Sequence, residues 1–163
     1  MTLCLIAAHD PDLLIGADGE LPWHYPEDMK HFVQTTKGHP VIMGRGVFEE
    51  IGEKPLPGRE NFVVTRSRSY DQVRTCRSIS EALDLVTQFE KVFVIGGSEI
   101  YRQTIDRADE LYITEIHQKY DGDRWFPEYR DKISTVWEET ERRDGEELSF
   151  VKYRRKWDYT NKF

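Results

Sequence analysis

Short apolar runs of strand length alternate with polar turns and helical patterns along the chain. Residues 3–8 are apolar at every position and residues 41–43 repeat this pattern, which is typical of strands in a sheet covered on both faces. Helical periodicity begins at Pro26, and Ser80 is expected to cap a helix that reaches about Phe89. Further strands are expected over 61–66, 73–76, 91–95 and 110–117, and a hairpin over 135–141 and 148–157.

A stiff loop leads into a helix whose apolar face carries a carboxylate. Two prolines four residues apart prevent a helix in the loop between them, and Pro26 suits the first helical position because its missing N–H would have no partner there. The helical spacing then places Asp28 beside Phe32, on the side that also carries Met29 and Val33.

The carboxylate of Asp28 allows two interpretations. In the first it caps the first helical turn, where the helix dipole favours an anion by about 0.3–1 kcal/mol. In the second it faces a pocket and pairs with a polar, partly cationic ligand, and burial raises its pKa enough to make it a candidate for proton handling. The segment on its own favours the first interpretation.

Other candidate chemistry lies in turns. Residues 44–46 and 96–97 form glycine turns between a strand and a helix, where free N–H groups bind phosphate, although many such turns bind nothing. Neither turn carries the Gly-x-Gly-x-x-Gly pattern of a Rossmann site. The rigid turn 55–59 presents Arg59, which suits a carboxylate but is also typical of a solvated surface. In segment 13–19, glycines stand at both ends of Ala17-Asp18, so this segment is expected to be a mobile loop. Such a loop can cover a site or lie on a plain surface.

Composition narrows the classes of function. A length of 163 residues suits one domain, and the net charge of −7 argues against general nucleic-acid binding. No apolar run approaches a membrane span and no signal peptide is visible, so we expect a cytoplasmic protein. A monomer is expected as well. Cys4 and Cys76 are interpreted as reduced, buried thiols. No metal site is predicted, because Pro26 puts His24 outside the helix that carries Asp28 and His31.

Taken in order, these segments resemble the dihydrofolate reductases of the bacterial chromosomal type, from Leu3 to about Trp157. The resemblance rests on Leu5-Ile6-Ala7-Ala8, Ile15-Gly16, Leu21-Pro22-Trp23, Pro26-x-Asp28 with Phe32, Pro40-Val41-Ile42-Met43-Gly44-Arg45, Pro55-Leu56-Pro57-Gly58-Arg59, Ile95-Gly96-Gly97 with Ile100-Tyr101, and Gly122-Asp123 followed by Phe126-Pro127. It implies an α/β fold: a single domain, 1–163, with a mostly parallel eight-stranded sheet, an antiparallel C-terminal strand and helices on both faces. Within it, about 39–89 would form an adenosine-binding subdomain and 158–163 a tail.

The resemblance also implies hydride transfer from NADPH to C6 of 7,8-dihydrofolate, with protonation at N5 through a water. Asp28 would bind the pterin 2-amino group and N3, Thr114 would share its hydrogen-bond network, and Arg59 would grip the glutamate α-carboxylate. The implied catalytic residues are Asp28, Leu21 and Trp23. The implied substrate-binding residues are Ile6, Ala7, Asp28, Phe32, Ile51, Leu56, Arg59 and Thr114.

For the cofactor, the resemblance places the loop from Ile15 to Trp23 over the nicotinamide and joins Gly96 to Gly97 by a cis peptide. Three cations near the adenosine 2′-phosphate would favour NADPH over NADH. The implied cofactor-binding residues are Ala8, Ile15, Gly16, Ala17, Asp18, Gly19, Glu20, Leu21, Gly44, Arg45, Gly46, Val47, Thr65, Arg66, Arg77, Ile95, Gly96, Gly97, Ser98, Glu99, Ile100 and Tyr101.

The chain departs from the family pattern in the cofactor region, and two other functions stay open. Gly46 and Val47 stand where a basic residue and a threonine are common, which predicts weaker cofactor binding, and Glu99 would repel the phosphates unless it points away. One alternative is a reductase of the same fold that acts on a ribosylated pyrimidine in riboflavin synthesis, which needs neither Asp28 nor Arg59. The other is a non-catalytic pterin- or nucleotide-binding module, against which the intact Asp28 and loop argue.

Overall fold

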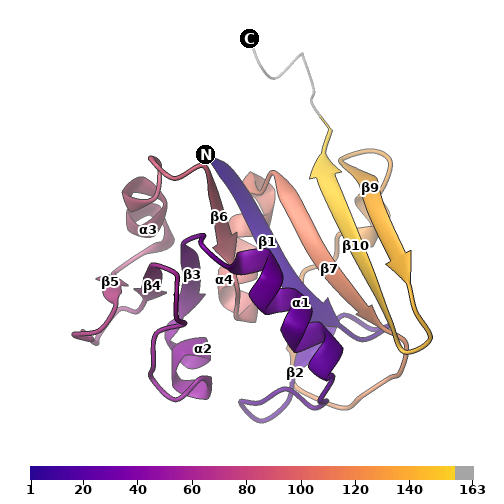
Figure 1. Cartoon of the computed structure of the whole chain (residues 1–163), viewed down its shortest axis with the longest axis horizontal. Helices are drawn as coiled ribbons and strands as arrows, with labels where there is room; N and C mark the ends of the chain where they lie inside the picture. Colours follow the sequence, from indigo (N-terminus) through magenta and orange to yellow (C-terminus); the bar gives the residue numbers. More distant parts are fainter. Residues whose placement is uncertain (157–163) are drawn as a thin grey trace.

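The computed structural model describes residues 1–156, and its main sheet has eight strands in the order β5-β4-β3-β6-β1-β7-β10-β9 (Figure 1). The strands are β1 (Thr2–His9), β3 (Val41–Gly44), β4 (Asn61–Val64), β5 (Arg74–Cys76), β6 (Lys91–Val94), β7 (Glu110–Ile116), β9 (Trp137–Asp144) and β10 (Leu148–Arg155). From β5 to β7 all neighbours are parallel, whereas β10 is antiparallel to both β7 and β9. The expected α/β fold is therefore confirmed. The predicted tail and Trp157 lie outside the described residues.

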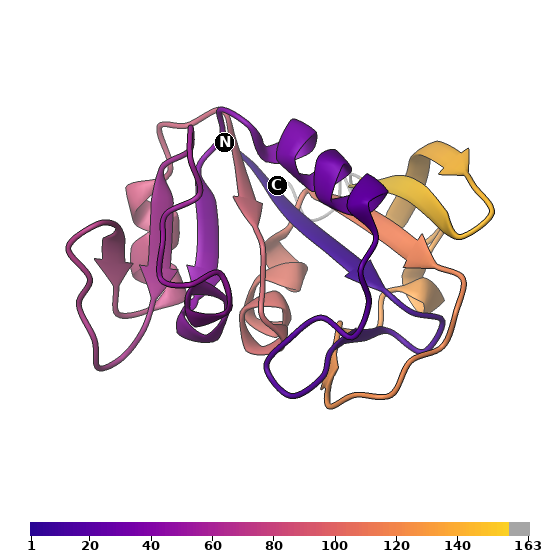
Figure 2. The same ribbon diagram turned by 60° about the horizontal axis from the view of Figure 1, so that its bottom comes forward.

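Helices cover both faces of this sheet. They are α1 (Pro26–Thr36), α2 (Arg45–Glu50), α3 (Ile79–Leu85) and α4 (Ser98–Thr104), with 3₁₀ turns at Ile105–Arg107 and Arg130–Lys132. Figure 2 shows α1 on one side of the sheet and α4 on the other. One apolar core lies under α3 and α4, and a second core, around Ile6, is covered by Phe48 of α2 and Phe32 of α1.

Strand β1 separates the two cores because its side chains alternate between the faces. Leu5 belongs to the core under α3 and α4, and it is fully buried. Its neighbours Cys4 and Ile6 belong to the other core. The continuous apolar run therefore forms a central strand, as predicted.

Two predicted helix features differ in the structure. Ser78, not Ser80, caps α3: its Oγ accepts a hydrogen bond from the N–H of Glu81 at 3.0 Å, and the helix ends at Leu85. The pattern Ser-x-x-Glu is a capping signal that explains the earlier start. On α1, Met29 and Val33 are 49% and 43% exposed. Each residue advances 100° around a helix, so these two fall beside the buried stripe that runs through positions 28, 32 and 36.

The segment expected to be a mobile loop is held in part by a second, small sheet. Strand β2 (Leu14–Gly16) pairs with β8 (Arg124–Trp125), and Asp123 donates its N–H to the Gly16 carbonyl at 3.0 Å. The chains approach so closely that a Cβ on Gly122 would lie 2.3 Å from the Gly16 carbonyl oxygen. Glycine at 122 is therefore a requirement of this contact.

A buried carboxylate fixes the end of β1 to both loops. Asp10 is fully buried, and its Oδ1 accepts the N–H groups of Asp12 and Leu14 at 2.8 and 2.9 Å. Its Oδ2 accepts the N–H of Tyr120 at 3.0 Å. One side chain thus ties three backbone segments together.

We predict that Asp10→Ala lowers the free energy of unfolding by about 2–4 kcal/mol, because three backbone N–H groups lose a charged acceptor. A hydrogen bond to a charged group contributes roughly 1.5–3 kcal/mol when it is buried, as that of Leu14 is, and less where it is only partly buried, as for Asp12 and Tyr120. Denaturant unfolding followed by circular dichroism measures the loss. The control is Asp12→Ala, whose exposed carboxylate only lies 3.7 Å from Lys119 and should matter by less than about 1 kcal/mol. Equal losses in the two variants would contradict the role of Asp10.

Candidate active site

The centre of the candidate site is a carboxylate on α1 bonded to a hydroxyl on β7. Thr114, which is 3% exposed, donates its hydroxyl to Asp28 Oδ1 at 2.7 Å. Within residues 1–156, Asp28 Oδ2 has no hydrogen-bond donor and no cation pairs with either oxygen. Asp28 therefore does not act as a cap of its own helix, and the geometry favours the pocket interpretation, with one oxygen left for a ligand.

The surroundings of Asp28 disfavour its charge. Burial raises the pKa of the Asp28 carboxyl, and the hydrogen bond from Thr114 opposes this rise without cancelling it. The nearby Glu27 carboxylate adds to the rise. A carboxylate in this state is stabilised by a ligand that donates N–H groups or carries positive charge.

Four of the predicted substrate contacts lie in one apolar cluster. Ile6 is buried, and Phe32, Ile51 and Leu56 pack against the same core as partly buried side chains. The side chain of Ala7, also predicted to be a substrate contact, instead belongs to the core on the opposite face. Strand alternation explains this, because residues 6 and 7 of β1 must point to opposite sides. Only the backbone of Ala7 is available to the site.

Trp23 presents a buried polar atom without a partner. The residue is 8% exposed and packs against the Tyr120 ring, with 5.2 Å between ring centres, yet its indole Nε1 has no acceptor within residues 1–156. Trp23 belongs to the cluster against which Ala8 packs, and Ala8 is the sheet partner of Thr114. A buried N–H donor without a protein acceptor typically donates a hydrogen bond to an ordered water. Leu21, also predicted to be catalytic, is 51% exposed.

The two glycine turns meet at the carboxyl ends of the parallel strands. Gly44 at the end of β3 donates its N–H to the Gly96 carbonyl at 2.9 Å, and Gly96 is joined to Gly97 by a cis peptide, as expected. Tyr101 on α4 donates its hydroxyl to the Ile6 carbonyl of β1 at 2.6 Å. This edge is where ligands bind in open α/β sheets.

The predicted cations at this edge differ in how they are engaged. Arg77 braces its own loop by donating to the Thr65 carbonyl at 3.1 Å and to Ser69 Oγ at 2.9 Å. Arg45 pairs with Glu49 at 2.8 Å between exposed side chains. Arg66 is exposed and has no ion pair among the described residues. The sequence alone did not distinguish these roles.

Glu99 and the tip of the 17–20 loop complete the predicted cofactor side. Glu99 pairs with Arg102 and accepts a hydrogen bond from Gln103, so its carboxylate is engaged by its own helix. Ala17 and Glu20 are bridged by backbone hydrogen bonds of 2.8 and 3.0 Å. A separate cavity of about 370 Å³ lies between Arg102 and residues 123–127, and shares only Ser98 with the predicted set.

Two polar residues that the sequence analysis missed hold predicted ones in place. Asn61 bonds the backbone of the turn that carries Arg59, and Thr36 bonds the Arg59 guanidinium. Thr36 follows Asp28 and Phe32 at intervals of four, which was the signal available in the sequence. Among the described residues, no cluster of three possible metal ligands occurs and no helix has the length and apolar character to cross a membrane.

Comparison with known proteins finds relatives over nearly the whole chain. A family model described as dihydrofolate reductase matches residues 2–155. The chain is 44% identical over 144 residues to dihydrofolate reductase type 3 of Salmonella typhimurium, covering 87% of this chain and 86% of that protein. It is 43% identical over 129 residues to the dihydrofolate reductase of Bacillus subtilis, covering 78% and 76%. A solved structure of dihydrofolate reductase from Enterococcus faecalis, complexed with NADP(H) and RAB-propyl, gives a TM-score of 0.85 at 35% identity, covering 94% of this chain and 96% of that one.

We predict that Asp28→Asn raises the free energy of unfolding at neutral pH and not at acid pH. The folded state raises the pKa of Asp28, so between the unfolded and folded pKa values the folded protein binds the proton more tightly and loses stability as the pH rises. The amide removes this loss and still accepts the Thr114 hydroxyl. Denaturant unfolding at both pH values tests this.

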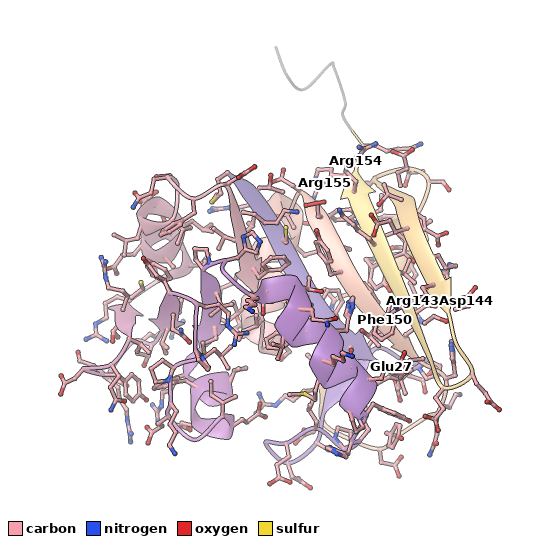
Figure 3. All side chains as sticks on the ribbon, in the orientation of Figure 1. Glu27, Arg143, Asp144, Phe150, Arg154 and Arg155 are labelled. Carbon is pink, nitrogen blue, oxygen red and sulfur yellow. The ribbon has the colours of Figure 1, made fainter. Side chains whose placement is uncertain are left out.

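The control for this prediction is Glu27→Gln, which changes the neighbouring exposed carboxylate on α1 (Figure 3). This substitution should alter stability by less than about 0.5 kcal/mol. An Asp28→Asn variant that is less stable than the parent at neutral pH would contradict the burial cost.

Proposed function

This chain belongs to the dihydrofolate reductase family, and from that premise we propose that it transfers a hydride from NADPH to C6 of 7,8-dihydrofolate and adds a proton at N5. The observation that carries the proposal is the Asp28 carboxylate, buried beside apolar walls, with one oxygen bonded to Thr114 and the other left open. Tetrahydrofolate is the product.

We propose that Asp28 binds the pterin through its 2-amino group and N3. These are adjacent N–H donors in one plane, which match the two oxygens of a carboxylate. Burial disfavours the charged form of Asp28 in the free protein, and this raises its pKa. Hydrogen bonds from the two N–H donors offset that cost, and they therefore contribute to the binding energy. The apolar walls made by Ile6, Phe32, Ile51 and Leu56 suit the flat rings of the substrate.

Protonation at N5 is assigned to a water and not to Asp28 itself, which binds the opposite end of the pterin. The unpartnered Nε1 of Trp23 and the hydroxyl of Thr114 are groups of the chain that can hold a water beside the pterin. Asp28 contributes by making N5 more basic. Leu21, in the exposed part of the loop, is proposed to close over the site and exclude bulk water.

The residues at the strand ends fit a dinucleotide. When bound there, NADPH supplies the hydride. Gly46 and Gly97 leave space in which an added Cβ meets nothing closer than 3.9 Å, so the backbone can approach phosphates. Arg45 and Arg66 are proposed to bind the 2′-phosphate, whereas Arg77 positions the loop that carries Thr65. Glu99 is engaged by Arg102, which limits its repulsion of the pyrophosphate.

We further propose a cytoplasmic monomer with residues 39–89 as the adenosine-binding part. Cys4 and Cys76 are free and lie in different cores, which suits a reducing compartment. No observation favours the pyrimidine reductase, which needs neither Asp28 nor Arg59. None favours the non-catalytic module either, against which the intact Asp28 and the loop argue.

The test of this function is the loss of NADPH absorbance in the presence and absence of 7,8-dihydrofolate. We expect the protein to oxidise NADPH only when 7,8-dihydrofolate is also present. Asp28→Asn should lower kcat by roughly 10²–10⁴-fold at neutral pH, the usual range for loss of acid–base assistance, and by less at acid pH, where the substrate acquires its own proton. Glu27→Gln is the matched control: kcat at neutral pH should stay within about twofold of the parent, and the pH profile should shift only slightly toward lower pH, because this substitution removes the smaller contribution of Glu27 to the Asp28 pKa. Full activity of Asp28→Asn at neutral pH would show that its role is misassigned.

The cofactor assignment predicts that Arg45→Ala and Arg66→Ala each weaken NADPH binding about tenfold or more and leave NADH binding almost unchanged. The reason is that a charge-assisted hydrogen bond to the 2′-phosphate, which NADH lacks, contributes roughly 1.5–3 kcal/mol. Fluorescence titration measures both affinities. Arg154→Ala, at the opposite end of the sheet on β10 (Figure 3), is the control for loss of a positive charge. Equal losses for NADPH and NADH would remove the 2′-phosphate argument.

A further inference from the structure

The hydroxyl of Thr36 joins the end of α1 to the guanidinium of Arg59. Thr36 is fully buried, its Oγ1 donates to the Phe32 carbonyl at 2.9 Å, and the same oxygen accepts a hydrogen bond from Arg59 Nη1 at 2.8 Å. A hydroxyl carries a single hydrogen. Because the Phe32 carbonyl takes it, the lone pairs of Thr36 must face the cation, and the side chain is committed to this orientation.

A second hydrogen bond restrains the same guanidinium. Arg59 Nε donates to the Pro57 carbonyl at 3.0 Å, and the guanidinium carbon lies 6.0 Å from the centre of the Phe32 ring. Arginine has five N–H donors in a rigid plane. Two of them are therefore used, and the other three, including both hydrogens of Nη2, have no acceptor within residues 1–156.

The backbone beneath Arg59 is fixed as well. Asn61, 6% exposed, accepts the Leu56 N–H at 2.9 Å and donates its amide to the carbonyls of Leu56 and Arg59 at 3.1 and 2.9 Å. The arginine is thus held at its Cα by Asn61 and at its charged end by Thr36. An arginine ordered before binding loses less side-chain entropy when it meets a ligand.

We propose that Thr36 is a positioning residue that orients Arg59 for the α-carboxylate of the substrate's glutamate tail. This inference rests on the proposed function and adds the residue that sets the geometry of tail recognition. Asp28 and Thr36 lie eight residues apart on one face of α1, or about 12 Å along its axis. One helix therefore carries the carboxylate for the pterin end of the substrate and the hydroxyl that directs the cation for the other end.

The test compares two substrates, 7,8-dihydrofolate and 6-methyl-7,8-dihydropterin, which lacks the benzoylglutamate arm. Thr36→Val keeps the shape and removes the hydroxyl. We expect KM for dihydrofolate to rise about tenfold, equivalent to about 1.4 kcal/mol, with kcat within about twofold of the parent. Both constants for the tail-less pterin should be unchanged. Thr36→Ser, which keeps the hydroxyl, should restore the parent KM to within about twofold.

Thr104→Val is the matched control for stability. Thr104 is also fully buried near the end of a helix and donates its hydroxyl to the carbonyl four residues back, that of Ile100, at 2.7 Å. Within residues 1–156, however, its hydroxyl accepts no hydrogen bond from a cation. The Thr104→Val variant should lose about as much stability as Thr36→Val and leave KM unchanged for both substrates. In an Arg59→Ala background, Thr36→Val should add no further increase in KM for dihydrofolate, because the group it orients is absent.

Three results would overturn the inference: an unchanged KM for dihydrofolate in Thr36→Val, an equal rise for both substrates, or an undiminished rise in the Arg59→Ala background. Failure of the proposed function is distinguishable, since a parent protein that reduces neither substrate removes both proposals. A parent that reduces both substrates, with Thr36→Val indistinguishable from it, removes only the role of Thr36.

Discussion

The hydrogen bond from Thr114 to Asp28 is the interaction on which the candidate site depends, because it fixes a charged helix residue against the central sheet. It joins β7 to α1 and leaves one carboxylate oxygen open. Burial raises the pKa of this carboxyl, which means that its charged form is destabilised in the free protein. A planar ligand that donates N–H groups can stabilise that charged form. The fold accepts this unfavourable burial at the place where we propose that the pterin binds.

The rest of the architecture serves to keep that oxygen beside apolar walls and a glycine-lined edge. Parallel strands β3, β6 and β1 end together, and the contacts of Gly44 with Gly96 and of Tyr101 with Ile6 draw these ends close. The Asp10 carboxylate accepts backbone hydrogen bonds from the two neighbouring loops and so holds them to the end of β1. Helices and strands thus surround the candidate site, whereas the segment around residues 17–21, which we propose covers it, is largely exposed.

Polar side chains outside the proposed ligand contacts set the orientation of arginines that were expected to bind a ligand. Asn61 fixes the turn and Thr36 fixes the guanidinium of Arg59, while the carbonyls of Thr65 and Arg68 and the hydroxyl of Ser69 hold Arg77 to its own loop. The arginines that looked alike in sequence are therefore held differently. Arg59 is bonded to Thr36, Arg77 is bonded to its own loop, and Arg66 is exposed without an ion pair among the described residues. Such differences arise from the carbonyls and hydroxyls that surround each cation.

The local pattern of the sequence by itself determined most of the elements of the main sheet and the helices, and their order. The apolar run of β1, the proline at the start of α1 and the glycine turns after β3 and β6 all act within a few residues, so the chain encodes them directly. Only the tertiary structure decided that Asp28 faces Thr114 and not solvent, that Ala7 points to the other core, and that Leu14–Gly16 pairs with β8. These depend on contacts between residues as many as about a hundred positions apart, where pairing and burial override local preference.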